Sequence, residues 1–339
     1  GIKPDLSALE NVCNSLSNLE LNEKLIIIES SIPPGTMENI VVPIIKKTNK
    51  DCMIAFVPER LSPGQAFSEI QTTPRIIGYI DKISGELTKL LYKNLVTSKI
   101  FLTNAKVAEI SKLVENTFRD VNVALANEIS LICEKYDIDF LELQKVCNSH
   151  PRVNLLDAGP GVGGPCLPKD PFLLLNPSNS ESISSEIIES ARKTNDSMPN
   201  HVVEIAKSAL AKVDKSLTGS KITVLGVTYK ANVSDVRLSP AKGIISKLLE
   251  SSNEVIVYDP QTSESFGAQK NTNLWNSISD SDVLIIVTNH DEFKNLDLNQ
   301  IKSKMKTPII VDTRRIFDSN QAEEIGIMYY AVGYGGKHS

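Results

Sequence analysis

Short, uninterrupted apolar runs recur along the chain and limit the folds that it can adopt. They lie at residues 24–29, 54–57 and 75–79, and again at 222–227, 254–260, 282–287, 308–312 and 328–332. Such runs are typical of strands buried on both faces of a parallel sheet. Helical stretches between them, including 7–19, 36–47 and 240–251, predict α/β domains whose ligands bind at the carboxyl ends of the strands.

Longer helices separate the two groups of strands. Residues 104–136 contain neither proline nor glycine and predict one long helix. A shorter helix is expected over 139–148, and a long one over 181–213 that is interrupted near Pro199. We therefore predict two Rossmann-like parallel-sheet domains joined by a long-helix middle domain, with boundaries at 1–102, 103–214 and 215–339.

Composition excludes several classes of protein. The chain has a net charge of -5, so no overall basic field attracts nucleic acid. No apolar run approaches the roughly 20 residues of a membrane-spanning helix. The five scattered cysteines favour free thiols in the cytoplasm. Neither they nor the four histidines show metal-ligand spacing, so no metal site is expected.

A loop dense in glycine and proline, residues 159–170, presents a single thiol, Cys166. Lys169 and Asp170 follow closely, and a thiol beside cationic groups titrates low and becomes a nucleophile. Gly159, Gly161 and Gly164 match the spacing of a dinucleotide-binding turn, but prolines follow them, so no helix is expected to start here. The alternative is a rigid linker with a buried, inert cysteine.

Other polar residues stand where ligands could bind. Lys112, Asn116 and Arg119 share one face of the long helix, although a solvated charged stripe would have the same spacing. Ser31 and Glu59 follow strands, with an ordinary loop position as the alternative. Arg314 and Arg315 follow another strand and could hold a phosphate bidentately, although exposed arginine pairs are common.

Four motifs together resemble the UDP-glucose/GDP-mannose dehydrogenase family over nearly the whole chain. They are Val57-Pro-Glu-Arg-Leu with Pro63-Gly64, the segment from Lys112 to Asn122, Gly161-Val-Gly-Gly-Pro-Cys-Leu-Pro-Lys-Asp170, and Gly226-Val-Thr-Tyr-Lys230 with Asp235-Val-Arg-Leu-Ser-Pro240. His150-Pro-Arg-Val-Asn154 looks most like the branch that oxidises UDP-N-acetyl-D-mannosamine. That branch often has His where this chain has Pro165.

The resemblance implies NAD as the cofactor and two successive oxidations of the sugar C6 alcohol to a carboxylate, with one water consumed. It implies that Lys112 and Asp170 handle the alcohol proton, Asn116 orients the oxygen, Cys166 forms a thioester and Glu59 activates the hydrolytic water. It further implies contacts of Ser31 and Arg237 with NAD. The sugar-nucleotide site would be formed, together with Lys112 and Asn116, by Arg60, Leu61, Arg119, His150, Arg152, Gly163, Tyr229, Lys230 and Arg314.

The residues by themselves also allow other functions. The substrate could be UDP-glucose or UDP-N-acetylglucosamine, the chain could be a UDP-sugar-binding protein without catalysis, or Cys166 could serve a hydrolase with His150 as the base.

Assembly and completeness are also expectations from sequence. We expect a homodimer, or a dimer of dimers, formed through Val107, Ile110, Val114, Val121, Leu125 and Ile129 of the long helix, with burial of these residues within one chain as the alternative. The family resemblance implies that Arg152 reaches the partner subunit's site. The family begins with a strand, a Gly-x-Gly-x-x-Gly turn and a helix, none of which is present here. The expectation is an incomplete first sheet, in a fragment of a longer enzyme or in a defective product.

Overall fold

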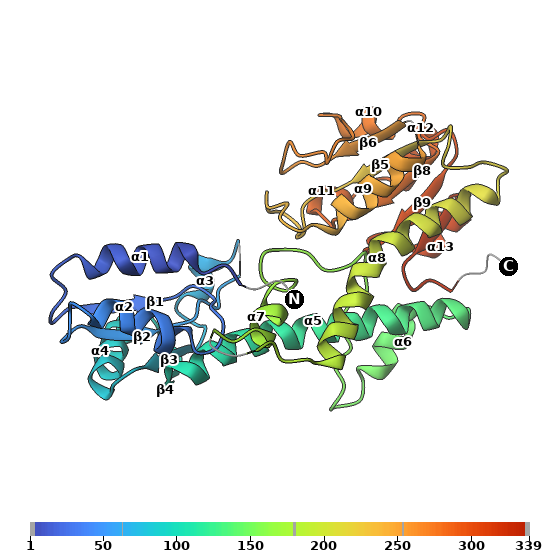
Figure 1. Cartoon of the computed structure of the whole chain (residues 1–339). Coiled ribbons are helices and arrows are strands. Elements are labelled where there is room, and N and C mark those ends of the chain that lie inside the picture. The colour runs from blue at the N-terminus through green and yellow to red at the C-terminus, as the bar shows by residue number, and fades with distance from the viewer. Residues whose placement is uncertain (1–3, 63, 179–180, 253, 336–339) are drawn as a thin grey trace. The chain divides into compact units, whose positions relative to one another are not determined.

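A computed structural model describes residues 4–62, 64–178, 181–252 and 254–335. Pro63, in the Pro63-Gly64 part of the first motif, lies outside the described residues. The chain forms two compact units (Figure 1). The first unit contains the chain up to Phe118 and Lys169–Glu186, and the second contains Arg119–Pro168 and the chain from Ile187 onward. Each unit is described by itself.

The sheet of the first unit has the order β1-β2-β3-β4, formed by Leu25–Ile28, Met53–Phe56, Arg75–Tyr79 and Ile100–Asn104. β1 pairs with β2, and β3 with β4, in parallel, but β2 and β3 are antiparallel. The prediction of parallel pairing was wrong at this point. The connection from β2 to β3 contains only the four-residue helix α3 (Ala66–Glu69), whereas a parallel crossover usually contains a longer helix that packs on the sheet.

Helices cover this sheet and complete its core. They are α1 (Ser7–Ser17), the π-helical turn η1 (Met37–Val41) that continues as α2 (Val42–Lys46), and α4 (Lys82–Lys93). Met37, Val41 and Ile45 are fully buried with Ile54 and Phe56 in one cluster. This buried apolar stripe packs η1 and α2 against β2.

The middle of the chain contains α5 (Ala105–Lys135), α6 (Phe140–Cys147), α7 (Asp170–Leu175) and α8 (Glu186–Ala211). Two predictions were wrong here. α7 begins directly after the glycine-rich loop, because Pro171 lies in the first turn, where no backbone N–H is required. α8 continues through Pro199 instead of being interrupted there, and it begins at Glu186.

The sheet of the second unit is entirely parallel and has the order β10-β9-β8-β5-β6-β7. Read from β7, this is the doubly wound order 3-2-1-4-5-6, whose switch point lies between β5 and β8. Val283 and Ile285 join the core on one face, and Leu284 and Ile286 the core on the other. The strands are Lys221–Leu225, Glu254–Tyr258, Gln269–Lys270, Val283–Ile286, Ile309–Asp312 and Met328–Ala331.

The helices of this sheet are α9 (Pro240–Ser251), α10 (Leu274–Ile278), α11 (Asp291–Lys294), α12 (Leu298–Lys304) and α13 (Ser319–Glu324). The sequence predicted α9 to the residue, because Ser239 caps the helix and Pro240 starts it. It did not predict β7 or the four helices that follow. Across the described part of the chain, no helix has the length and apolar character needed to cross a membrane.

Candidate active site

A buried carboxylate lies at the start of α7 in the first unit. Asp170 is 0% exposed, and its Oδ2 accepts a hydrogen bond of 2.6 Å from Nδ2 of Asn116 on α5. Its Oδ1 is also buried and has no hydrogen-bond partner among the described residues. Burial raises the pKa of Asp170, although the bond from Asn116 and the charges of Lys169 and Lys112 oppose this. The geometry thus joins three predicted catalytic residues around a carboxyl group that can hold a proton.

The helix α5 determines which of its polar residues reach this carboxylate. Asn116 is 5% exposed, and Lys112, one turn earlier, is half-buried. A solvated stripe therefore does not describe these two positions. Arg119, by contrast, is exposed and belongs to the second unit.

Glu59 follows β2 and is fixed through one of its oxygens. Its Oε1 accepts bonds from the backbone N–H groups of Arg60 and Leu61 at 2.6 and 2.7 Å. It also accepts one from Nη1 of Arg75 at 3.3 Å, and Arg75 is only 2% exposed. All these bonds use Oε1, which leaves Oε2 as the oxygen that can take a proton from water. No pattern in the sequence predicted that Arg75 supports Glu59.

Arg60 contacts α5 in this structure. Its Nε and Nη2 form a pair of bonds with the Glu115 carboxylate, at 3.1 and 2.8 Å, and Nη1 donates to the carbonyl of Pro74. This bidentate pair fixes the loop that contains Glu59 and Leu61. Arg60 therefore acts first as a brace for the site, and any contact with substrate would come from the remaining surface of its guanidinium.

Sequence reasoning missed a second buried carboxylate on α5. Glu109 is 1% exposed, and its two oxygens accept from the backbone N–H groups of Gly35 and Met37, each at 2.7 Å. Burial raises the pKa of Glu109, and these two hydrogen bonds oppose the rise. The carboxylate fastens the loop after β1, which contains Ser31, to the helix that contains Lys112. Its signal in the sequence, an acidic residue on a helix, is the same as that of a solvated side chain.

We expect the change Glu109→Gln to destabilise the chain by about 1–3 kcal/mol, because the amide keeps one acceptor and turns a donor toward a buried N–H. Urea unfolding measures this difference. Glu115→Gln is the control on the same helix; its half-exposed ion pair should contribute less than about 1 kcal/mol. Equal losses of stability in the two variants would contradict the role of Glu109 in fastening the loop after β1 to α5.

The thiol of Cys166 belongs to the second unit, on a loop that packs closely against Tyr229. A Cβ on Gly163 would lie 2.7 Å from the Leu238 carbonyl oxygen, and one on Gly164 would lie 2.8 Å from the Tyr229 ring. Gly164 also has φ +92° and donates its N–H to the carbonyl of Arg237 at 3.0 Å. Glycine is therefore required here for close approach, and Gly163 shapes the site through packing.

Charged groups surround this loop. Burial raises the pKa of the Tyr229 hydroxyl, and the charges of Asp235 and Cys166 add to the rise, so all three lie near one another. Arg237 is exposed and forms a bidentate pair with Asp235, through Nε at 3.0 Å and Nη2 at 2.6 Å. Cys166 is half-buried, and Lys230 is half-buried next to Tyr229. The predicted thiol thus lies near Tyr229 and Arg237, which are predicted contacts of UDP and of NAD.

The two arginines after β9 differ in role. Arg315 binds Asp139 with two parallel bonds of 2.8 and 2.7 Å, so its phosphate-binding prediction was wrong. Arg314 donates from Nε to the carbonyl of Val287, and its Nη1 would lie 2.9 Å from a Cβ on Gly159. Burial lowers the pKa of Arg314 to about 10, so it remains charged at neutral pH. Of these two arginines, only Arg314 remains a candidate for binding the nucleotide.

His150 and Arg152 lie in an exposed turn after α6. Nδ1 of His150 accepts the backbone N–H of Arg152 at 3.3 Å. Within the described part of the second unit, no hydrogen bond joins His150 to Cys166. A thiol nucleophile needs its base within hydrogen-bond reach, so this geometry does not favour a cysteine hydrolase.

Comparison with known proteins decides the family. Three domain models of the UDP-glucose/GDP-mannose dehydrogenase family match consecutive segments: the NAD binding domain at 1–96, the central domain at 106–197 and the UDP binding domain at 223–319. A UDP-N-acetyl-D-mannosamine dehydrogenase of Methanocaldococcus jannaschii is 42% identical, over 98% of this chain and 76% of the relative. The chain belongs to the UDP-glucose/GDP-mannose dehydrogenase family.

Solved structures of this family agree with the fold described above. The UDP-D-ManNAc dehydrogenase of Pyrococcus horikoshii is 37% identical with a TM-score of 0.91, covering 98% of this chain and 78% of that one. The UDP-N-acetyl-mannosamine dehydrogenase of Staphylococcus aureus is 36% identical with a TM-score of 0.83, covering 98% and 76%. The predicted fold class is confirmed. The boundaries at 102 and 214 stay predictions.

The family places the chain among the NAD-dependent oxidoreductases. Residues at the carboxyl end of β1 fit part of that cofactor. Ser30 is exposed and Ser31 half-buried, and Glu29 accepts a bond from the Tyr92 hydroxyl beside them. Such small polar groups suit the ribose hydroxyls and amide of a dinucleotide at this edge of the sheet. The N–H groups at the start of η1 do not suit its phosphates, because Glu109 already occupies them.

Proposed function

We propose that the chain oxidises the C6 alcohol of UDP-N-acetyl-D-mannosamine to the carboxylate, in two steps and through a thioester on Cys166. The observation on which this rests is the buried Asp170 carboxyl with one unpartnered oxygen, four positions after the thiol in the chain. NAD, when bound, accepts the hydride in each step. The named relatives above act on this UDP-sugar, which supports it as the substrate.

The first oxidation needs a group that takes the alcohol proton. Lys112 and Asp170 serve this purpose, because the Lys112 charge acts on a carboxyl group whose proton affinity burial has raised. Asn116 is held by its bond to Asp170, so its side-chain amide is fixed for orienting the sugar oxygen. Loss of a hydride from C6 and of the hydroxyl proton gives the aldehyde.

The second oxidation needs a tetrahedral carbon at C6. The Cys166 thiolate adds to the aldehyde carbon, loss of a second hydride from C6 leaves a thioester, and water then cleaves the carbon–sulfur bond. Glu59 accepts the proton of that water through Oε2, because Oε1 is already held by two backbone N–H groups and Arg75. The oxygen of the water enters the product carboxylate and the thiol is regenerated.

The remaining predicted residues hold the nucleotide and the cofactor. Tyr229, Lys230 and Arg314 would contact UDP, and Arg237 and Ser31 would contact NAD. The sugar site would also include Leu61 and Gly163, with Arg60 as the brace, and the exposed residues Arg119, His150 and Arg152.

NADH production measured by absorbance tests the proposal. UDP-N-acetyl-D-mannosamine should yield two NADH per sugar, and mass spectrometry should show a product that has gained one oxygen and lost two hydrogens. UDP-glucose and UDP-N-acetylglucosamine are the comparison substrates. A single NADH per sugar would leave the aldehyde as the product and contradict the thioester route.

We also propose that two copies of the chain associate through α5. In the first unit Val107 and Val114 are 49% and 46% exposed, and in the second unit Leu125 and Ile132 are 50% and 48% exposed. Ile110, Val121 and Ile129 are only half-buried. Apolar residues that recur at this spacing on a helix and remain exposed favour an interface.

Leu125→Asp should convert a dimeric mass into a monomeric one, because it places a charge in the apolar contact. Light scattering at micromolar concentration measures the mass. Val12→Asp, an equally exposed apolar position on α1, is the control and should leave the mass unchanged. A parent chain that is already monomeric would refute the interface.

A further inference from the structure

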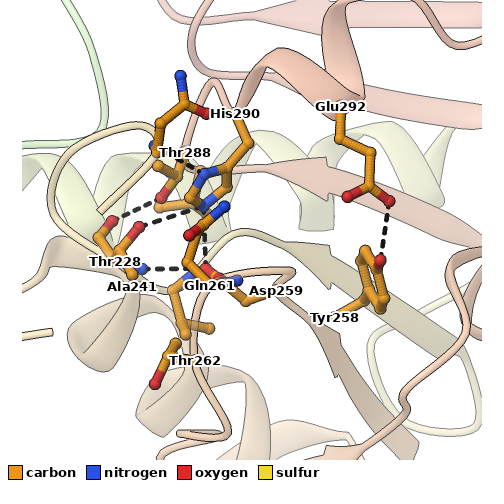
Figure 2. Close-up of polar contacts among 12 residues, drawn as sticks. Thr228, Ala241, Tyr258, Asp259, Gln261, Thr262, Thr288, His290 and Glu292 are labelled. Atoms are coloured by element: carbon orange, nitrogen blue, oxygen red, sulfur yellow. Dashed lines mark hydrogen bonds and ion pairs between the residues drawn. The ribbon is translucent and has the colours of Figure 1, made fainter. Parts of the chain in front are cut away.

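The switch point of the second sheet is filled by the chain's own side chains. The loops after β5 and β8 approach so closely that a Cβ on Gly226 would lie 2.5 Å from that of Thr288. In doubly wound sheets this crevice is where nucleotides usually bind. Here it contains His290, which is 0% exposed, in contact with Asp259 at the end of β6 (Figure 2).

Asp259 accepts hydrogen bonds from backbone N–H groups that could otherwise bind a phosphate. Its Oδ2 accepts from the backbone N–H groups of Val227 at 2.7 Å and Thr228 at 3.3 Å, and Oδ1 accepts from that of Gln261 at 2.8 Å. Burial opposes ionisation, but the bonds from His290 and these N–H groups lower the pKa of Asp259 overall. The carboxylate is therefore charged and holds the start of the loop that follows β5.

The hydrogen bonds of His290 identify its tautomer. Nδ1 accepts the backbone N–H of Asn232 at 3.0 Å, so Nδ1 has no proton. Nε2 then carries the hydrogen and shares it between Asp259 at 3.1 Å and the Thr228 hydroxyl at 3.2 Å. That hydroxyl donates onward to the carbonyl of Lys230. A neutral imidazole thus binds the chain on both sides of Tyr229.

The same loop leads to the thiol. We call residues 227–239 the nucleotide loop. Within it the Tyr229 N–H donates to the carbonyl of Asp235, and the Arg237 carbonyl accepts from Gly164, two residues before Cys166. The ring of Tyr229 lies against Gly164. Any freedom gained by the nucleotide loop is therefore passed directly to the loop that contains Cys166.

We propose that Asp259 and His290 form a buried lock that positions the nucleotide loop and, through Tyr229, the Cys166 loop. Both are positioning residues, since they act through the nucleotide loop that they bind. The lock itself rests on contacts within the second unit. Its effect on UDP rests on the function proposed above, which places Tyr229 and Lys230 at the nucleotide.

Two measurements test the lock independently. The first is the alkylation rate of Cys166 by iodoacetamide, followed by peptide mass spectrometry in a Cys147→Ser background, because Cys147 is the other cysteine that is not buried. The second is calorimetric titration with UDP alone. The variants are Asp259→Asn, His290→Ala and His290→Asn. Tyr258→Phe is the matched control, since it loses a 2.8 Å bond to Glu292 beside the lock without touching the nucleotide loop (Figure 2).

We expect Asp259→Asn and His290→Ala to raise the alkylation rate and weaken UDP binding, each on the order of tenfold, because buried hydrogen bonds to the loop are lost. His290→Asn should recover part of both effects, since its Oδ1 can accept the Asn232 N–H. Tyr258→Phe should equal the parent chain.

Parental alkylation rates in the folded Asp259 and His290 variants would overturn the lock, whatever the UDP result. Thr228→Val, which removes the hydroxyl between His290 and Lys230, gives the same test if the other variants do not fold. A parent chain that fails to bind UDP would contradict the proposed function instead, and the alkylation rates would still decide the lock.

Discussion

Cys166→Ala should abolish four-electron turnover, lowering it by a factor of at least ~1000, because a covalent catalyst is removed. An alcohol dehydrogenase that stops at the aldehyde needs no thiol. Reaching the carboxylate requires a second hydride to leave from a tetrahedral carbon, and the thiolate supplies the fourth substituent of that carbon. The first oxidation should therefore be affected much less than the second.

Single-turnover NADH yield from the UDP-sugar measures this, with the UDP-aldehyde supplied as a second substrate. Cys147→Ala is the control, because Cys147 is also half-buried but lies on α6. Lys112→Ala should differ from Cys166→Ala by slowing the first oxidation itself. The thioester assignment is wrong if Cys166→Ala converts the aldehyde to the acid at the parental rate.

The sequence predicted elements well where one local pattern decided them. The continuous apolar runs gave β1, β5, β6, β8, β9 and β10 nearly in full, since strands buried on both faces need no alternation. It failed where a tertiary contact decided the outcome. Whether β3 runs parallel or antiparallel to β2 depends on what the connection packs against, and no periodicity records that.

The same limit applies to the site. Lys112, Asn116 and Asp170 could be predicted together because family motifs contain all three. In the structure Asn116 binds Asp170, and the charge of Lys112 acts on it. Glu109, Arg75 and His290 were missed. Each looks like a single polar residue in its segment, and its partners lie far away in the sequence, as Gly35 and Met37 do for Glu109. Arg315 shows the opposite error, since a plausible phosphate ligand proved to be the partner of Asp139.

Asp170→Asn should separate catalysis from folding. We expect the rate of the first oxidation to fall on the order of 100-fold or more, the range for loss of a general acid–base group. Asn116 can rotate its amide to present its oxygen to the new side chain, so the buried pair is preserved. The measurement is the single-turnover rate of NADH formation.

The stability of Asp170→Asn should rise at neutral pH, although its rate of oxidation falls. Burial raises the folded-state pKa of Asp170 above its unfolded value, so the folded chain binds this proton more tightly. The stability linked to that proton is fully present below the unfolded pKa, about 4, and is lost as the pH rises through the folded pKa. Above the unfolded pKa the parent chain therefore loses stability as the pH rises, because its buried carboxyl group has an unpartnered Oδ1, and the amide does not titrate.

Urea unfolding of both chains should accordingly find Asp170→Asn at least as stable as the parent at neutral pH, with the difference vanishing near pH ~4, below which both side chains are neutral. Asp51→Asn, an exposed carboxylate in the same unit, should change neither the rate nor the stability. A variant that is both less stable at neutral pH and fully active would show that Asp170 serves the fold. A slower but more stable variant would show that the buried carboxylate is kept, at a cost in stability, for the proton of the substrate alcohol.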